Sequence, residues 1–261
     1  MNKLLHTPLT VHNVELANRL VMPPMATGKT PDGTVQDDLL AYYDARSKGG
    51  YIGLIVTEHA YISPEGKAHE GQLSVSRDTD IPGLTKLVET IHKNNTAVIA
   101  QINHAGSAAT EEITGCPAIS ASAEPVAGHV RKSEKPVREM TIDDIHTVAK
   151  KFAEAALRVK EAGFDGVEIH AAHGYLLDQF YSPLGNKRTD AYGGDPHRRI
   201  PPEEAQCAKP WARITSLPCV SARATTPRAA RPLTTRCMPA KSLRKPVLTC
   251  SIFPAASTAL R

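Results

Sequence analysis

The last 67 residues of this chain of 261 contain no glycine. All 17 glycines lie at or before Gly194. The same stretch holds 10 of the 20 prolines and 4 of the 5 cysteines, and 12 Lys and Arg stand there against 3 Asp and Glu. Residues 1–194 have the opposite balance, with 19 basic side chains against 24 acidic ones. The net charge of +4 therefore joins a mildly acidic segment, 1–194, to a basic Arg- and Pro-rich segment, 195–261.

Long apolar runs and paired cysteines are also missing. No stretch approaches the roughly 18 apolar residues of a membrane helix, and His6 and Pro8 interrupt the start of the chain, where a secretory signal needs an apolar run. Cys116 is the single cysteine of residues 1–194, and the later cysteines form no CxxC pair. This spacing argues against a disulfide framework and against a zinc or iron–sulfur site. We expect a cytoplasmic protein with no metal site and no membrane partner.

Residues 1–194 alternate between short apolar runs and longer helical patterns, which is typical of α/β strand–helix–strand units around a parallel sheet. Thr141 and Asp144 have the spacing of a capping box at the start of a helix. We predict strands over residues 19–22, 53–57, 97–102 and 166–169, and helices over 36–47, 81–94 and 141–162. A complete (β/α)8 TIM barrel needs about 250 residues and eight such units, so these four units predict the first half of one.

The loops after the predicted strands carry the candidate functional residues. In a barrel of this class these loops gather at the carboxyl ends of the strands, where the active site lies. Residues from four loops are therefore expected to meet: Pro24, Met25, Ala26 and Thr27; Glu58 and His59; Gln101 and His104; and the segment from His170 through His173 to Tyr175.

The motif His170-Ala-Ala-His173-Gly-Tyr175 follows the fourth predicted strand. Two imidazoles three residues apart can offer two N–H donors to one oxygen atom, and such donors stabilise negative charge that develops on it. The phenol of Tyr175 suits proton donation to a strongly basic carbanion better than base catalysis at neutral pH. The spacing alone leaves two other interpretations open, a pair of metal ligands and a structural loop.

Four motifs taken in order resemble the Old Yellow Enzyme family of FMN-dependent NADH:flavin oxidoreductases. They are NRLVMPPM at 18–25, KGG at 48–50, QINHAG at 101–106 and HAAHGYLLDQFYSPLGNKRTDAYGG at 170–194. The resemblance covers residues 1–194 and is strongest to bacterial ene-reductases and to the barrel domain of dienoyl-CoA reductases. It implies a TIM barrel that binds FMN, oxidises NADH or NADPH and reduces an activated alkene.

The resemblance also implies which residues hold the flavin. Pro24, Met25 and Ala26 would line it beside its reactive nitrogen, and Gln101 would contact its pyrimidine edge. His59 or Glu58 would be a further contact after the second strand.

On the substrate side, the resemblance implies that His170 and His173 bind the carbonyl oxygen of an α,β-unsaturated compound. Tyr175 matches the proton donor of the family. Full-length relatives are often homo-oligomers, and no specific nucleic-acid partner is implied.

Residues 195–261 depart from the family, whose members continue with a Ser-x-Glu-Asn-Arg segment and a strand that carries a flavin-binding arginine. A change of reading frame explains the departure. Residues 247–256, back-translated and read from the third base of each codon, permit Val-Asp-Leu-Leu-Asp-Ile-Ser-Gly-Gly, a typical family strand. Residues 206–212 and 219–226 give further matches in family order. We expect a frameshifted, poorly ordered tail.

The tail leaves two alternatives open for the function of the chain. One is a non-catalytic remnant of such an oxidoreductase, because half of the barrel and the loops that hold the phosphate are absent from the family pattern. The other is a nucleic-acid-binding protein, since clustered Lys and Arg lend nonspecific affinity for phosphate. We expect the chain as written to bind FMN weakly.

Overall fold

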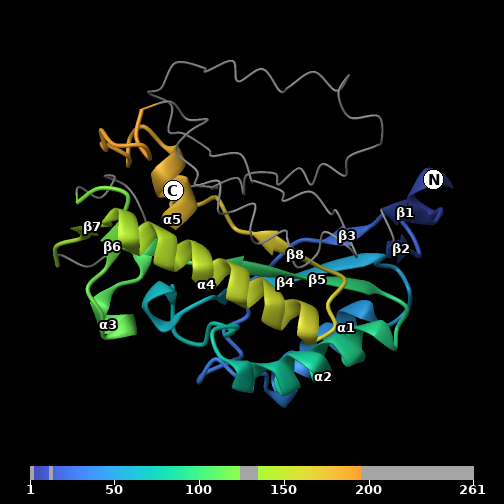
Figure 1. Ribbon diagram of the computed structural model, residues 1–261. Helices are drawn as coiled ribbons and strands as arrows, with labels where there is room; N and C mark the ends of the chain where they lie inside the picture. Colours follow the sequence, from blue (N-terminus) through green and yellow to red (C-terminus); the bar gives the residue numbers. More distant parts are fainter. Residues whose placement is uncertain (1–2, 12–13, 124–134, 195–261) are drawn as a thin grey trace, which may run out of the picture. The chain divides into compact units, whose positions relative to one another are not determined.

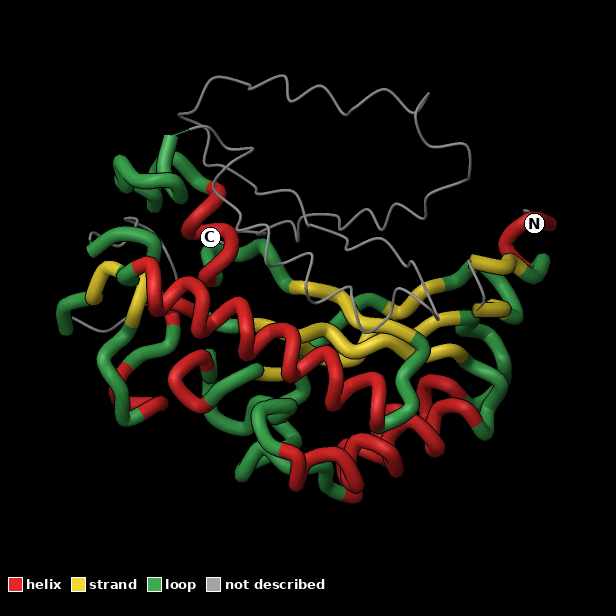
Figure 2. Tube along the Cα trace, viewed as in Figure 1, coloured by secondary structure: helices red, strands yellow, loops and turns green. Residues whose placement is uncertain are grey.

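A computed structural model describes residues 3–11, 14–123 and 135–194 of the chain (Figures 1 and 2). The predicted tail, 195–261, lies outside the described residues, and so do the three stretches compared in another frame.

The core of the molecule is a four-stranded parallel sheet in the order β3-β4-β5-β8. Its strands are β3 (Val21–Met22), β4 (Leu54–Tyr61), β5 (Ala97–Asn103) and β8 (Gly166–Ile169). These are the four predicted strands. Strands that are adjacent in the sheet come from predicted units that follow one another along the chain, as in the first half of a barrel.

Two strands differ from the prediction by two residues or more at one end, and both differences have a local cause. The first strand begins at Val21 instead of residue 19, because the side chain of Asn18 accepts a hydrogen bond from the backbone N–H of Leu20 and turns the chain there. The second strand extends to Tyr61, so that Glu58 and His59 lie within β4 and not in the loop after it. Polar residues at the end of the run concealed this extension.

Three long helices cover one face of the sheet (Figure 1). They are α1 (Asp37–Ser47), α2 (Ile81–His92) and α4 (Ile142–Glu161), each within two residues of its predicted bounds. The predicted capping box is present, with Thr141 and Asp144 each accepting from the backbone N–H of the other. One apolar core joins alternate strand residues to these helices and includes Ile55, Val98, Ala100, Ile102, Ile169, Leu84, Leu87, Ile91, Val148 and Phe152.

The opposite face of the sheet has a smaller apolar cluster near the amino ends of the strands. Leu54, Val56 and Ile99 form it together with Leu16 from a short antiparallel hairpin, β1 (Leu9–Val11) and β2 (Val14–Leu16). Each hairpin strand has three residues, which is too short for alternation to stand out in the sequence.

Short elements occupy the connections, including those after strands β5 and β8. They are the 3₁₀ turns Lys3–His6, Pro64–Gly66, Asp78–Asp80 and Gly106–Ala108, helices α3 (Glu111–Thr114) and α5 (Leu176–Tyr181), and the two-residue strands β6 (Ile119–Ser120) and β7 (Arg138–Glu139). None of the helices in the described ranges is both long and apolar enough to cross a membrane.

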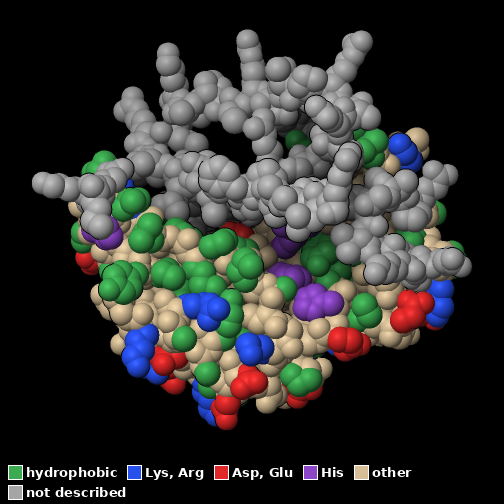
Figure 3. Space-filling model, turned by 180° about the vertical axis from the view of Figure 1, so that it is seen from behind, with side chains coloured by type: hydrophobic (Ala, Val, Ile, Leu, Met, Phe, Trp, Pro, Cys, Tyr) green, Lys and Arg blue, Asp and Glu red, His purple; other side chains and the backbone are tan. Residues whose placement is uncertain are grey.

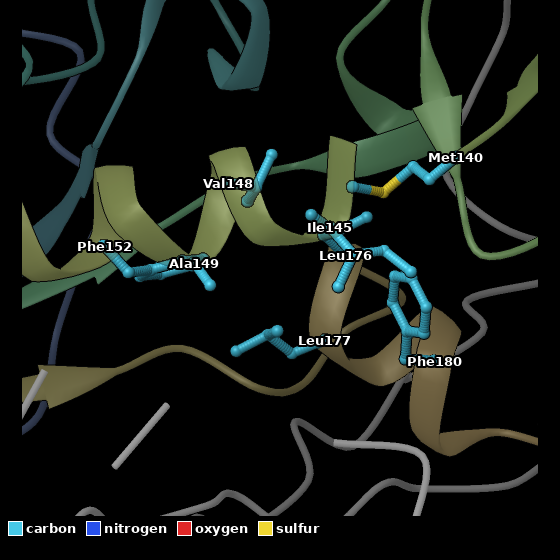
Figure 4. A pocket seen from close by; sticks show the side chains of 8 residues that line it. All are labelled: Met140, Ile145, Val148, Ala149, Phe152, Leu176, Leu177 and Phe180. Atoms are coloured by element: carbon cyan, nitrogen blue, oxygen red, sulfur yellow. The ribbon is translucent and has the colours of Figure 1, made fainter. Parts of the chain in front are cut away.

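Helix α5 packs beside α4 along an apolar groove (Figure 4). Val148 and Phe152 line it from α4, and Leu177 and Phe180 line it from α5. Phe180 is 2% exposed, so the contact is a genuine part of the core and ties the segment after β8 to the helical layer. The position of His170 to Tyr175, between β8 and α5, is thereby held from both ends.

Candidate active site

The candidate residues come from the carboxyl ends of the parallel strands, where the chain leaves the sheet. His59 lies near the end of β4, Gln101 near the end of β5, and His170 directly after β8. Seen from behind in Figure 3, histidine side chains gather in one patch next to apolar ones. The ring contacts described below join His59, His69, His170, His173 and Tyr175, and we call these five residues the histidine cluster.

The loop from His170 to Gly174 has a tightly defined backbone. The N–H of His170 continues the ladder by donating to the carbonyl of Ile102 at 3.0 Å. His173 adopts a positive φ of 56°, which is uncommon for a residue with a Cβ, and Gly174 follows with a φ of 73°. The N–H of Gly174 donates to the carboxylate of Asp178 at 2.8 Å. These contacts turn the chain so that both histidines belong to one cluster.

The protonation state of His170 follows from its surroundings. Burial, with His59 and His173 nearby, lowers the pKa of His170 to about 3, so its ring is neutral at pH 7. Its Nδ1 accepts the backbone N–H of Ala172 at 3.3 Å, which leaves the ring proton on Nε2. Nε2 in turn lies 3.2 Å from Nδ1 of His173. His170 therefore presents an N–H donor toward the more exposed ring of His173.

Tyr175 stands at the start of α5 and stacks on His170. The two ring centroids are 4.8 Å apart at an interplanar angle of 27°. The phenolic oxygen lies 3.4 Å from Nε2 of His59, whose own ring is 5.7 Å from that of Tyr175. Burial raises the pKa of Tyr175, which keeps the phenol protonated and able to donate at neutral pH.

Gln101 has a buried carboxyl partner that the sequence prediction did not include. Its side-chain amide donates to Glu168 at 2.5 Å, and the two residues face each other in register on β5 and β8. Burial raises the pKa of Glu168. Glu168 is the one charged residue of β8, whose sequence is Gly-Val-Glu-Ile. That charge within a short apolar strand was the signal from which a buried pair could have been predicted.

The loop after β3 reaches the cluster through a second buried carboxylate. Glu58 is 1% exposed and accepts both the backbone N–H and the hydroxyl of Thr27, at distances from 2.7 to 3.0 Å. Burial raises the pKa of Glu58, and the hydrogen bonds from Thr27 oppose that rise. Met25, by contrast, is 54% exposed. In the described structure, no ring contact or hydrogen bond joins Pro24, Met25 or Ala26 to His59. Their segment is connected to His59 through the next residue, Thr27, which bonds to Glu58.

His69 was not predicted either, and it completes the cluster from the loop after β4. Its ring centroid is 5.3 Å from that of His59. Nδ1 lies 2.8 Å from the carbonyl oxygen of Glu70 and so carries the ring proton, while nothing in the described ranges bonds the buried Nε2. No periodicity or motif marks a single histidine in such a loop.

Comparison with known proteins agrees with the arrangement of the strands. Residues 4–201 match the model of the NADH:flavin oxidoreductase / NADH oxidase family. A protein named metal reductase from Desulforamulus reducens is 42% identical over 197 residues, which cover 76% of this chain and 29% of that protein. An NADPH dehydrogenase from Geobacillus thermodenitrificans is 40% identical over 201 residues, covering 76% of this chain and 57% of that enzyme.

Two solved structures have the same fold over most of the chain. Morphinone reductase in complex with tetrahydroNAD superposes with a TM-score of 0.75 at 28% identity, covering 85% of this chain and 64% of that one. Old Yellow Enzyme from Pichia sp. AKU4542 gives 0.75 at 31% identity, covering 85% and 60%. The predicted TIM-barrel fold class is confirmed. The chain spans under two thirds of each of these four proteins, and it belongs to the NADH:flavin oxidoreductase / NADH oxidase family.

Proposed function

We propose that residues 1–194 form the flavin- and substrate-binding half of an FMN-dependent oxidoreductase. It would pass hydride from NADH or NADPH to an activated alkene, an enone or an enoyl compound. The observation that carries this proposal is the close approach of Nε2 of His170 and Nδ1 of His173, 3.2 Å apart, with Tyr175 stacked beside them. Two donors close together suit the carbonyl oxygen of such a substrate, and a third donor beside them suits protonation of its α-carbon.

The protein groups would act on the substrate in two ways. Nε2–H of His170 would donate to the carbonyl oxygen, and His173 would add a second donor when its proton is on Nδ1. Bound FMN would supply the hydride for the β-carbon. The hydroxyl of Tyr175 would give its proton to the α-carbon, and the phenolate left behind would recover a proton from water.

The side chains at the strand ends fit the ring of FMN. Gln101 offers an amide, which can pair with the imide edge of a flavin, and it is 5% exposed beside Glu168. Met25 and Ala26 are exposed and offer apolar surface to a flat ring. In barrels of this kind the phosphate lies at the loops after strands seven and eight, beyond the four strands described. We therefore expect this chain alone to bind FMN weakly.

The test compares the full chain with a fusion in which residues 1–194 are followed by the remainder of the Geobacillus NADPH dehydrogenase. We expect the fusion to retain FMN and to oxidise NADPH when cyclohex-2-enone is added. In the fusion, Tyr175→Phe should slow alkene reduction by more than tenfold and leave flavin reduction unchanged. Tyr51→Phe, which alters a tyrosine that is 74% exposed, is the control. Equal losses in flavin reduction and in alkene reduction would contradict the proposal that Tyr175 is the proton donor.

The full chain decides between an enzyme and a non-catalytic remnant. An FMN-bound full chain that reduces cyclohex-2-enone supports an active enzyme as encoded. An active fusion beside an inactive full chain supports the remnant. If neither protein reduces the enone with the flavin bound, the proposed alkene chemistry is wrong.

We further propose that most of residues 195–261 come from a change of reading frame. The match to the family model ends at residue 201, and all 17 glycines precede residue 195. Turns with positive φ depend largely on glycine, which makes its absence over 67 residues unusual for this fold. Sequencing the coding DNA tests the idea. A continuous family pattern in another frame is expected, and an uninterrupted gene without one would refute it.

A further inference from the structure

His59 is brought to the histidine cluster by an irregularity in β4. The pairing of β4 with β5 is regular up to Val56, which lies opposite Ile99, and resumes with His59 opposite Gln101. Three residues of β4 thus span two of β5, which is the signature of a β-bulge. Without the extra residue, Glu58 would face Gln101. The bulge instead places His59 on the face that carries Gln101.

Contacts on the backbone and the ring hold His59 in this position. The carbonyl of His59 accepts the side-chain amide of Gln72 at 3.0 Å, and Gln72 also donates to Asn103 at 2.7 Å. The His59 ring centroid lies 5.9 Å from that of His170 and 5.7 Å from that of Tyr175. Since Tyr175 also stacks on His170, the three rings form one triangle.

The groups that face His59 are other imidazoles and one phenol. They are His69 from the loop after β4, and His170, His173 and Tyr175 from the segment after β8. Burial and the neighbouring imidazoles lower the pKa of His59 to about 4. The ring is therefore neutral at pH 7 and carries a single N–H, on either Nδ1 or Nε2.

The geometry points to His59 as a positioning residue for Tyr175, with Nε2–H donating to the phenolic oxygen. This hydrogen bond leaves the hydroxyl proton of Tyr175 free to point toward a substrate carbon, and it stabilises the phenolate that remains after the proton has moved. The O–H bond of Tyr175 breaks as the C–H bond forms, and water returns the proton afterwards. The inference deepens the proposed function and rests on it for the destination of the proton.

A physical consequence follows for the phenol itself. Hydrogen bonding to the charged form lowers a pKa, whereas burial raises that of Tyr175. Removing the Nε2–H donor of His59 should therefore raise the pKa of Tyr175, because only the effect of burial would remain. In the opposite tautomer the proton is on Nδ1, and Nε2 accepts from the hydroxyl of Tyr175 and so stabilises the neutral phenol. Removing the His59 ring should then lower the pKa of Tyr175. The direction of the change therefore distinguishes the two arrangements.

The first experiment is a pH titration of the full chain labelled with ¹³Cζ-tyrosine and observed by NMR, without FMN or NAD(P)H. Tyr175→Phe identifies the Tyr175 signal. His59→Phe keeps a ring but removes the donor, and we expect it to raise the pKa of Tyr175 by about 1, as for a lost hydrogen bond to a charged group. His59→Gln keeps a donor and should restore most of the difference. His69→Ala is the matched control, with an expected change near zero.

The second experiment reads the tautomer directly in the unmodified chain, and a variant is needed only to assign the signals. Long-range ¹H–¹⁵N NMR of imidazole-labelled full chain distinguishes a protonated from an unprotonated ring nitrogen, with His59→Gln used to assign the His59 signals. We expect the proton of His59 on Nε2 at pH 7. A proton on Nδ1, or a lower or unchanged pKa of Tyr175 in His59→Phe, would overturn the inference. Because neither measurement needs flavin or substrate, failure of enone reduction leaves this result standing.

Discussion

The helix-covered face of the sheet and the carboxyl ends of its strands are made of opposite kinds of side chain. Under α1, α2 and α4 the buried residues are aliphatic or aromatic, among them Leu87, Ile91 and Phe152. At the strand ends the buried residues include Glu58, Gln101, His104, Glu168 and His170. Both regions exclude water. The first gains stability from apolar burial, whereas the second must offset the cost of burying polar groups by pairing them.

The largest expected effect lies in the apolar region. Leu87→Ala removes a fully buried side chain of α2 and should lower the free energy of unfolding by about 3 kcal/mol, because lost burial and a new cavity both contribute. Urea unfolding followed by circular dichroism measures the loss. Leu157→Ala, at a position that is 51% exposed on α4, should change stability by less than about 0.5 kcal/mol. Similar losses in the two variants would contradict the assignment of the core.

An intermediate effect is expected where a buried charge loses a donor. Thr27→Val removes the hydroxyl that donates to Glu58 and should cost about 2 kcal/mol at pH 7, the range for a hydrogen bond to a charged group. It should also raise the pKa of Glu58 further above its ordinary value. The loss should shrink in acid, where the carboxyl is protonated with or without Thr27. Thr27→Ser keeps the hydroxyl, so an equal loss in that variant would argue against the hydrogen bond.

The smallest effect has the opposite sign. Burial raises the pKa of Glu168 in the folded chain, so the protonated carboxyl favours folding, and that contribution is lost as the pH rises through the folded pKa. Glu168→Gln keeps an acceptor for Gln101 without the charge, and it should stabilise the chain by about 1 kcal/mol at pH 7. The gain should vanish below the ordinary carboxyl pKa of about 4. Glu15→Gln, which alters an exposed residue of β2, is the control.

The strand–helix alternation was predictable because its signal is local. The spacing of Leu84, Leu87 and Ile91 marks α2, and Thr141 with Asp144 marks the start of α4, each within one or two turns of chain. The hairpin β1–β2 and helix α5 were not predicted. Both are short, and each is stabilised by packing on distant residues, so their own sequences carry too little periodicity.

The site was predictable only as a set of residue types. The motif from His170 to Tyr175, with His59 and Gln101, could be placed at strand ends, but the partners of these residues could not. Thr27 bonds to Glu58 across 31 positions of chain, Gln101 to Glu168 across 67, and Tyr175 approaches His59 across 116. No local pattern encodes pairs so far apart.

Sequence by itself thus determined the parallel strand–helix order, the family, and the break in composition after Gly194, since each depends on residue type and short-range spacing. Tertiary structure alone decided that a bulge in β4 turns His59 toward Tyr175, that His69 joins the cluster, and that Glu58 and Glu168 are buried with hydrogen-bond partners. The reason is physical. Register between strands and the depth of burial arise only when separate segments pack together, and these two quantities set which groups meet and how their pKa values shift.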